Sequence, residues 1–295
     1  MLFRSTPLNG RNFEYYGEDP VLAGKTAAGY VRGCQAFGVV ATPKHLAVNN
    51  QEICRTTGSS EVDERTLREL YLTAFEIVTK ESQPWMMMSS YNRINGQCAA
   101  ECGLTQELIV KREWGFDGVM VSDWGGAHHT VGCALGGLDL EMGCPPEGLF
   151  FGNALLDAVK TGAVPEAVID EKVRRILRLL YRVGVMDGTK PSAEIAGSQQ
   201  LRTAAEVAAG GMTLLKNDAG FLPLDAGKIK RLVVAGPNAD YRQHRGTLEF
   251  CGGSGAVFSD REVTPLAGLK AYGAKHGFAV EYFPVVKFDH DTLCP

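Results

Sequence analysis

An aspartate and a tryptophan follow a short apolar run in the stretch GVMVSDWGGAHH, residues 118–129. The apolar triplet 119–121 is typical of a buried strand, and Asp123 comes two residues after it. A buried carboxylate needs compensating partners, so Asp123 is a candidate nucleophile, general base, metal ligand or helix N-cap. Trp124 is either a core residue or one wall of a sugar site, because the C–H face of a pyranose stacks on a flat aromatic ring.

Two other apolar runs end in the same way, on side chains that can bind polar ligands. Lys44 and His45 follow GVVATP, and Tyr91 follows WMMMSS. A cation next to an imidazole suits hydroxyl or anion binding, and a surface lysine beside a hydrogen-bonded histidine is the alternative. Earlier in the chain, the segment GRNFEYYGEDP carries Arg11 and Glu14. The guanidinium of Arg11 suits recognition of neighbouring hydroxyls, and a structural ion pair is the alternative.

Metal, nucleotide and serine-hydrolase sites have no support in the sequence. The pair His128-His129 is not part of an H-x-H or H-E-x-x-H pattern, and Cys98 and Cys102 lack a matching second pair for zinc. The glycines of GGSG, residues 252–255, match neither the dinucleotide fingerprint nor the P-loop. No G-x-S-x-G elbow occurs. We therefore expect no metal and no cofactor.

Short apolar runs alternate with helical patterns, which predicts a parallel α/β fold. Apolar residues have helical spacing through 61–80, and a second helix is expected over 104–116 with Thr105 as its N-cap. A further strand is expected within GCALGGLDLEMG, residues 132–143. In such folds the ligand lies at the carboxyl ends of the strands, where the polar residues stand here. A (β/α)8 barrel is favoured, and a doubly wound sheet is the alternative.

A second domain is expected after a linker. We predict a (β/α) barrel domain over 1–185, a linker rich in Gly, Ser and Pro over 186–200, and the start of a second α/β domain over 201–295. The elements expected in that domain are a helix from 201, a short strand before 224, a strand within 228–240, a helix capped by Thr264 with Pro265 at its first position, and a strand over 278–286.

Composition is that of a globular protein. The 295 residues are 45% hydrophobic and 22% charged with a net charge of −4, so no surface for nucleic acid is indicated. No apolar stretch is long enough to cross a bilayer, so no membrane partner is expected. The first residues lack the apolar core of a signal peptide, and scattered cysteines are typical of reduced thiols. The location is left open, with a lean towards the cytoplasm.

Several motifs in a fixed order resemble glycoside hydrolase family 3, which contains many β-glucosidases and some β-xylosidases. The resemblance implies a TIM-like barrel followed by an α/β sandwich. It also implies a retaining hydrolase that releases a terminal non-reducing β-D-glucosyl residue from β-glucosides through a covalent glycosyl-aspartate. The motifs are GRNFEYYGEDP, KHLAVNNQE, VDERTLRELYLTAFE, SSYNRINGQ, GFDGVMVSDW, GLDLEMG and GGMTLLKNDAGFLPL.

The resemblance further implies a role for each candidate site residue. Asp123 is implied as the catalytic nucleophile, and Trp124 as the wall of the site towards the leaving group. Glu14 and Glu52 are implied to orient Arg11 and the lysine–histidine pair. The side chains implied to hold the non-reducing sugar are Arg11, Lys44, His45 and Tyr91.

Two departures from the family pattern lead us to expect a fragment. The barrel part is shorter than the roughly 250 residues of a whole barrel, so its first strands are expected to precede Met1. The general acid of most family members is a glutamate of the second domain, which is expected beyond residue 295. We expect the chain by itself to be inactive on cellobiose. The alternatives to a β-glucosidase are a β-xylosidase of the same family and an inactive sugar-binding fragment.

Overall fold

The computed structural model describes residues 6–143, 149–189, 197–241 and 262–285. The chain divides into two compact units, residues 1–195 and 196–295, which are described separately. The break falls inside the predicted linker, whose residues 190–196 lie outside the described residues. The GGSG glycines lie outside them as well.

Four parallel segments form the centre of the first unit. Strand β2 (Met86–Met88) pairs with β5 (Val119–Val121) in parallel, with Met87 opposite Met120. On either side, Leu46 bridges Ser89 and Leu140 bridges Val121, again in parallel. The apolar runs before Lys44, Tyr91 and Asp123 therefore lie side by side, and their polar ends reach the same edge. This arrangement confirms the predicted α/β fold.

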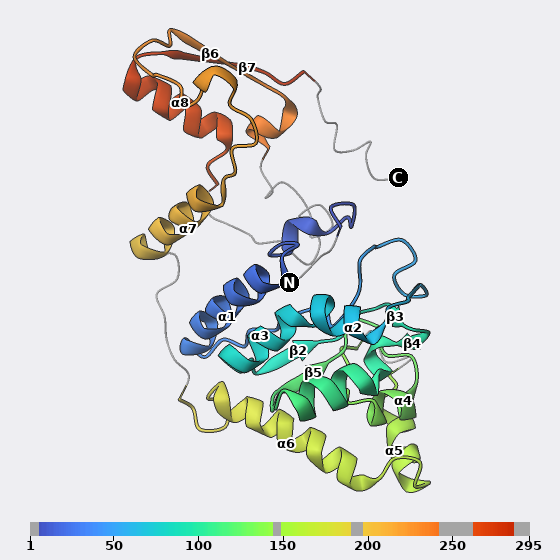
Figure 1. The fold of residues 1–295 in the computed structure, drawn as a ribbon. Helices are drawn as coiled ribbons and strands as arrows, with labels where there is room; N and C mark the ends of the chain where they lie inside the picture. The colour runs from blue at the N-terminus through green and yellow to red at the C-terminus, as the bar shows by residue number, and fades with distance from the viewer. Residues whose placement is uncertain (1–5, 144–148, 190–196, 242–261, 286–295) are drawn as a thin grey trace. The chain divides into compact units, whose positions relative to one another are not determined.

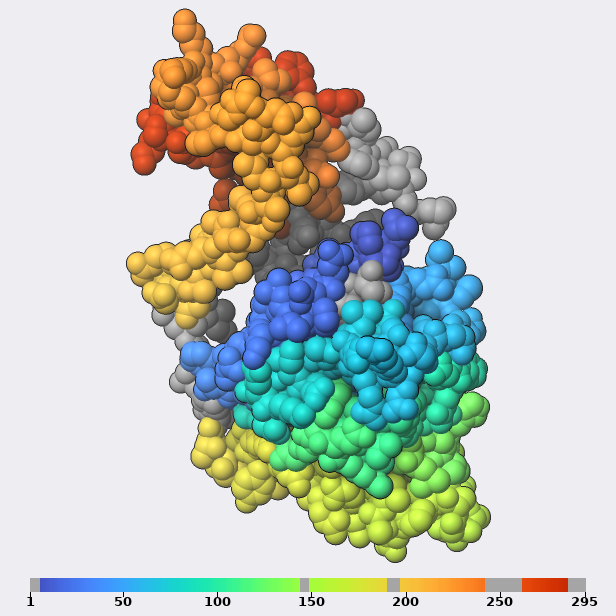
Figure 2. All heavy atoms as spheres, viewed as in Figure 1, coloured from blue at the N-terminus to red at the C-terminus, as the bar shows by residue number. Residues whose placement is uncertain are grey.

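Helices α1 (Pro20–Ala36) and α3 (Thr73–Ser82) pack against each other along one side of these strands (Figure 1). Asp19 caps α1, because its Oδ1 accepts hydrogen bonds from the backbone N–H groups of Val21 and Leu22, each at 2.8 Å. Gly24 allows the close approach, since a Cβ there would lie 2.9 Å from Ile77 Cβ. Figure 2 shows α1 (blue) on the outer surface of the unit beside the cyan α3.

Helix α6 (Glu166–Arg182) holds the segment that leads into β5. Arg175 Nη1 donates to the carbonyl oxygens of Phe116 and Gly118, both at 2.9 Å. Asp117, between them, forms a bidentate ion pair with Arg182 at 2.7 and 3.0 Å. The strand that ends near Asp123 is thus anchored at its start by α6. The core below it contains the fully buried side chains of Leu46, Met87, Phe116, Met120 and Leu138.

The helix predicted over 61–80 is present as α2 (Glu64–Thr66), a π-helical turn η2 (Leu67–Tyr71) and α3. The remaining elements of the first unit are η1 (Asn12–Glu14), β1 (Ser59–Ser60), β3 (Arg93–Ile94), β4 (Gln97–Cys98), η3 (Ala99–Glu101), η4 (Leu104–Glu113), α4 (Thr130–Leu135) and α5 (Asn153–Lys160). In the small sheet, β3 pairs with β1 in parallel and with β4 antiparallel.

Two local predictions in this unit are wrong. Thr105 does not cap its helix: η4 begins one residue earlier at Leu104, and the Thr105 hydroxyl donates to Cys102 O at 3.2 Å from inside the helix. The strand expected over 132–143 is divided. Its first half belongs to α4, and Leu140 pairs with β5. A short apolar run fits a buried helix and a buried strand equally well, so its pattern cannot distinguish them.

The second unit contains α7 (Ser198–Gly211), η5 (Asp218–Gly220), β6 (Arg231–Ala235), η6 (Pro237–Asp240), α8 (Pro265–His276) and β7 (Ala279–Phe283). Strands β6 and β7 are parallel neighbours, and α8 packs on β7. The predicted cap of α8 is confirmed, because Thr264 Oγ1 accepts from Ala267 N–H at 3.1 Å. The short strand expected before residue 224 is not formed; η5 lies there instead. None of the helices described is long and apolar enough to cross a membrane.

Candidate active site

Asp123 lies just past the end of β5 and is 6% exposed. Its Oδ1 accepts a hydrogen bond from the backbone N–H of Trp124 at 2.9 Å. Its carbonyl oxygen accepts from Gly126 N–H, also at 2.9 Å, which closes a tight turn after the strand. The backbone that follows the strand therefore fixes one oxygen of the carboxylate.

His45 brings an imidazole against this carboxylate from the segment on the other side of β2. Its Nε2 lies 3.2 Å from Asp123 Oδ2, and its side chain is 1% exposed. The parallel bridge between Leu46 and Ser89 places His45 at this edge. Burial lowers the pKa of His45 to about 4, and this desolvation outweighs the opposite effect of Asp123. The imidazole is therefore neutral at about pH 7.

Tyr91 contacts Asp123 from the third segment. Burial, together with the negative charge of Asp123 that the hydroxyl faces, raises the pKa of Tyr91 to about 12. The ring is covered by the guanidinium of Arg55, whose Cζ lies 4.6 Å from the ring centroid. Tyr91 is thus protonated near neutral pH and can act as a hydrogen-bond donor.

The charge of Asp123 depends on the balance between burial and its donors. Desolvation raises the pKa of the carboxyl, but the nearby His45 imidazole, the Trp124 N–H and the Tyr91 hydroxyl together lower it further than burial raises it. The net pKa lies below the ordinary value for an aspartic acid. Asp123 is therefore an ionised, nearly buried carboxylate, which is the state that a nucleophile needs.

Two cations, Lys44 and Arg11, and a second carboxylate, Glu14, belong to the same cluster as Asp123 and His45. Burial lowers the pKa of Lys44, while the negative charges of Asp123 and Glu14 act in the opposite direction. Arg11 forms an ion pair with Glu14 through its Nε. Its backbone N–H donates to Asn9 Oδ1 at 2.9 Å, which fixes the start of the turn η1. This ion pair is the contact through which Glu14 would orient Arg11, and that role stays a prediction.

Glu52 lies at the rim of the same cluster. Its Oε2 is 2.8 Å from Arg55 Nη1 and 3.9 Å from Arg11 Nη1. Its Oε1 accepts from Asn49 Nδ2 at 3.4 Å. Glu52 therefore bridges two arginines, and its predicted action on Lys44 and His45 stays a prediction. The Trp124 residue is 53% exposed, so its ring is not a core residue of the described unit.

The structure brings together residues that the sequence reasoning missed. Tyr15 OH lies 2.8 Å from His45 Nδ1, on the side of the ring away from Asp123. Arg55 joins Glu52 to the ring of Tyr91. Tyr15 is inside the motif GRNFEYYGEDP, directly after Glu14 and four residues after Arg11. A tyrosine next to charged residues in that motif was the available signal.

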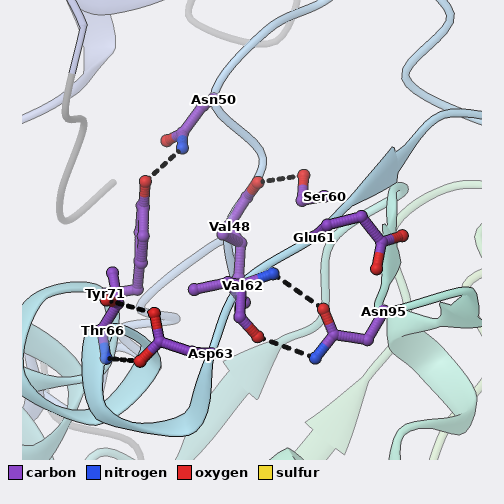
Figure 3. A pocket seen from close by; sticks show the side chains of 9 residues that line it. All are labelled: Val48, Asn50, Ser60, Glu61, Val62, Asp63, Thr66, Tyr71 and Asn95. Carbon is purple, nitrogen blue, oxygen red and sulfur yellow. Dashed lines mark hydrogen bonds between the residues drawn. The ribbon is translucent and has the colours of Figure 1, made fainter.

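A cavity of about 690 Å³ lies elsewhere in the first unit, between the segment 48–63 and the turn η2 (Figure 3). It includes none of the predicted site residues. Its polar groups are bonded to one another: Asn50 Nδ2 donates to Tyr71 OH at 2.8 Å, and Asn95 makes two hydrogen bonds to the backbone of Val62. The polar groups of this cavity are therefore already satisfied by the protein itself, and Asp123 stays the centre of the candidate site.

Comparison with known proteins identifies the family. Residues 4–179 match the N-terminal domain of glycosyl hydrolase family 3, and residues 212–289 match its C-terminal domain. The chain belongs to glycosyl hydrolase family 3. The resemblance seen in the motifs is thereby confirmed.

The family 3 chain is similar to several beta-glucosidases over most of its length. It is 39% identical to one of Bacteroides ovatus over 293 residues, 94% of this chain and 38% of that protein. It is 42% identical to one of Rhizobium radiobacter over 266 residues, 90% of this chain and 32% of that protein. The chain thus spans about a third of the curated relatives it matches.

Solved family 3 structures have the same fold. Beta-glucosidase 3B from Thermotoga neapolitana, in complex with glucose, superimposes with a TM-score of 0.82 at 34% identity, over 96% of this chain and 38% of that one. Beta-D-glucoside glucohydrolase from Trichoderma reesei does so with a TM-score of 0.84 at 34% identity, over 94% and 41%. The predicted fold class, part of a TIM-like barrel followed by the start of an α/β domain, is confirmed.

Proposed function

We propose that the protein carrying this chain is a retaining β-glucosidase with Asp123 as its nucleophile. The observation that carries the proposal is the ionised, nearly buried carboxylate of Asp123, held by His45, Tyr91 and the Trp124 N–H. The names of the relatives, all of them beta-glucosidases, support the reaction and the sugar.

In the proposed reaction an Asp123 oxygen attacks the anomeric carbon while the bond to the leaving oxygen breaks. The leaving oxygen takes a proton from a general acid. Water then attacks the glycosyl ester and gives a proton to the same acid group, which releases glucose and restores the carboxylate. We assign Lys44, His45 and Arg11 to the sugar hydroxyls, and Trp124 to the wall towards the leaving group.

The general acid is proposed to be a group other than the donors on Asp123. A general acid works best when its pKa lies near the working pH. The pKa of His45 is lowered to about 4, so the ring is not in its acidic imidazolium form near neutral pH, and that of Tyr91 is raised to about 12, so it holds its proton too tightly. A separate carboxyl group, expected from the family resemblance, fits the requirement better.

Trapping of the covalent intermediate tests the proposal. A deoxyfluoroglucoside with a good leaving group, whose fluorine replaces the hydroxyl next to the anomeric carbon, is expected to inactivate the whole protein and to label Asp123. Peptide mapping by mass spectrometry locates the label, and Asp123→Asn serves as the unlabelled control. A label on a different carboxylate, or reversible binding without any label, would contradict the assignment.

The sugar specificity is tested separately on the active protein. We expect aryl β-glucosides to be cleaved with a higher kcat/KM than the matching aryl β-xylosides, as the names of the relatives indicate. A higher value for the xyloside would replace the proposed β-glucosidase by a β-xylosidase and leave the role of Asp123 unchanged.

The pH dependence of the reaction is expected to report the charge of Asp123. Because the nucleophile must be ionised, kcat/KM falls as the pH drops through its pKa, which lies below the ordinary value. Tyr91→Phe removes one donor to the carboxylate, so this pKa rises and the acid limb moves up by roughly half to one pH unit. The exposed Tyr181→Phe is the matched control. An acid limb that stays in place or moves down in Tyr91→Phe would argue against this coupling.

A further inference from the structure

The ring of His45 is held from both sides. Nε2 faces Asp123 Oδ2 at 3.2 Å, and Nδ1 faces the hydroxyl of Tyr15 at 2.8 Å. Tyr15 comes from the segment directly after η1 (Asn12–Glu14), far from His45 in the sequence. The same turn carries the ion pair between Arg11 and Glu14. Tyr15 is thus tied to a part of the site that is itself fixed by charge.

The protonation state of His45 follows from its surroundings. Burial lowers its pKa to about 4, so the ring is neutral at about pH 7 and carries a single N–H. The ionised carboxylate of Asp123 can only accept hydrogen bonds. The proton therefore lies on Nε2, because a lone pair there would face the negative charge of Oδ2. Nδ1 is then an acceptor, and the Tyr15 hydroxyl is its donor.

The Nε2 atom of His45 lacks a well-aligned hydrogen-bond partner in the described part of the chain. It is buried, and Asp123 is within ion-pair distance. A donor in this position can serve a sugar hydroxyl that lies over Asp123. The direction of this N–H depends on how the ring is held, and the contact with Tyr15 is on the opposite ring nitrogen.

We propose that Tyr15 is a positioning residue for the hydrolysis. By donating to Nδ1 it fixes the orientation of the His45 ring and the tautomer that carries the proton on Nε2. That N–H then stays on the side of the ring that faces Asp123, where a hydroxyl of the bound sugar can accept it. Only the contact between this N–H and a sugar hydroxyl rests on the proposed function. The tautomer itself follows from the contacts in the protein without substrate.

Magnetic resonance of isotope-labelled histidine ring nitrogens tests the tautomer without any catalysis. The two signals of His45 are assigned by their absence from His45→Gln. At about pH 7 we expect Nε2 to carry the proton and Nδ1 to resonate as a hydrogen-bonded acceptor. In Tyr15→Phe the Nδ1 signal is expected to move towards that of an acceptor without a donor, and in the neighbouring Tyr16→Phe it is expected to stay. A protonated Nδ1, or no change in Tyr15→Phe, would overturn the proposal even if the protein is a β-glucosidase.

A double-mutant cycle tests whether Tyr15 acts through His45. Tyr15→Phe is expected to lower kcat/KM by about 10- to 100-fold, because it leaves a buried acceptor unpaired and loosens the ring. In the His45→Ala background the same change is expected to cost much less, whereas two independent effects would multiply. Tyr16→Phe is expected to leave kcat/KM nearly unchanged in both backgrounds. Equal losses from Tyr15→Phe in both backgrounds would mean that Tyr15 supports the fold and does not act through His45. Absence of activity in the unmodified protein would contradict the proposed function and leave the spectroscopic result standing.

Discussion

Asp123→Asn is expected to lower kcat by roughly 10⁴- to 10⁵-fold on an unactivated β-glucoside. The amide keeps the size of the side chain and can still accept the hydrogen bond from Trp124 N–H, which is 2.9 Å from Oδ1. It cannot form the glycosyl ester, so the covalent step is lost while the site keeps its shape. Steady-state rates on cellobiose measure the loss.

Asp117→Asn is the matched control for this variant. It makes the same chemical change six positions earlier, on a side chain that forms a surface ion pair with Arg182. We expect kcat to change far less there, because Asp117 precedes β5, at the opposite end from Asp123, and the amide can still accept a hydrogen bond from Arg182. Turnover of Asp123→Asn at a level close to that of this control would refute the nucleophile assignment.

Rescue of a nucleophile variant by azide shows from which face of the sugar the nucleophile attacks. In Asp123→Gly, azide is expected to enter the space left by the carboxylate and to attack the anomeric carbon of a substrate with an activated leaving group. The expected product is an α-glucosyl azide, because the incoming group takes the face that Asp123 occupied. A β-configured azide would place the nucleophile on the opposite face of the sugar.

Lys44→Ala is expected to lower kcat/KM by about 10²- to 10³-fold. Lys44 is a half-buried cation whose charge is favoured by Asp123 and Glu14. Its removal deletes a charged donor to the sugar, and it leaves the negative charges of Asp123 and Glu14 with less compensation. We expect a larger effect on kcat than on KM, because hydrogen bonds to the sugar strengthen as the ring flattens towards the transition state.

Lys25→Ala is the control for this change, since Lys25 forms an exposed ion pair with Glu81 on the outer surface. Both kinetic parameters are expected to stay close to those of the unmodified protein there. If Lys44→Ala raises KM and leaves kcat unchanged, Lys44 binds substrate and transition state equally. That result would contradict a catalytic role for Lys44.

The residue pattern was sufficient for the architecture around the site. Short apolar runs that end in Lys44-His45, Tyr91 and Asp123 predict parallel strands with a common polar edge, and the bridges from Leu46 to Ser89 and from Leu140 to Val121 confirm it. This works because strand length, apolar character and polar ends are local properties. Local signals also located the cap at Thr264, where a hydroxyl precedes a proline at the first helical position.

Local signals failed where the same pattern suits two structures. Thr105 has the residue type of an N-cap, but the helix begins at Leu104, so the Thr105 hydroxyl lies within the first turn. The stretch 132–143 looks like one strand, but its first half forms α4. In both cases packing against neighbouring elements decides between alternatives of similar local free energy.

The sequence by itself determined which side chains could do chemistry: a carboxylate after a strand, an imidazole and cation after another, and a tyrosine after a third. Only the tertiary structure decided their pairing. His45 Nε2 meets Asp123 across strands that are far apart in the chain, and Tyr15 reaches Nδ1 from a separate turn. Such contacts depend on strand register and on how α1 and α3 pack. Neither can be predicted from the residue pattern of a short segment. The neutral state of His45 likewise follows from burial, which exists only once the chain has folded.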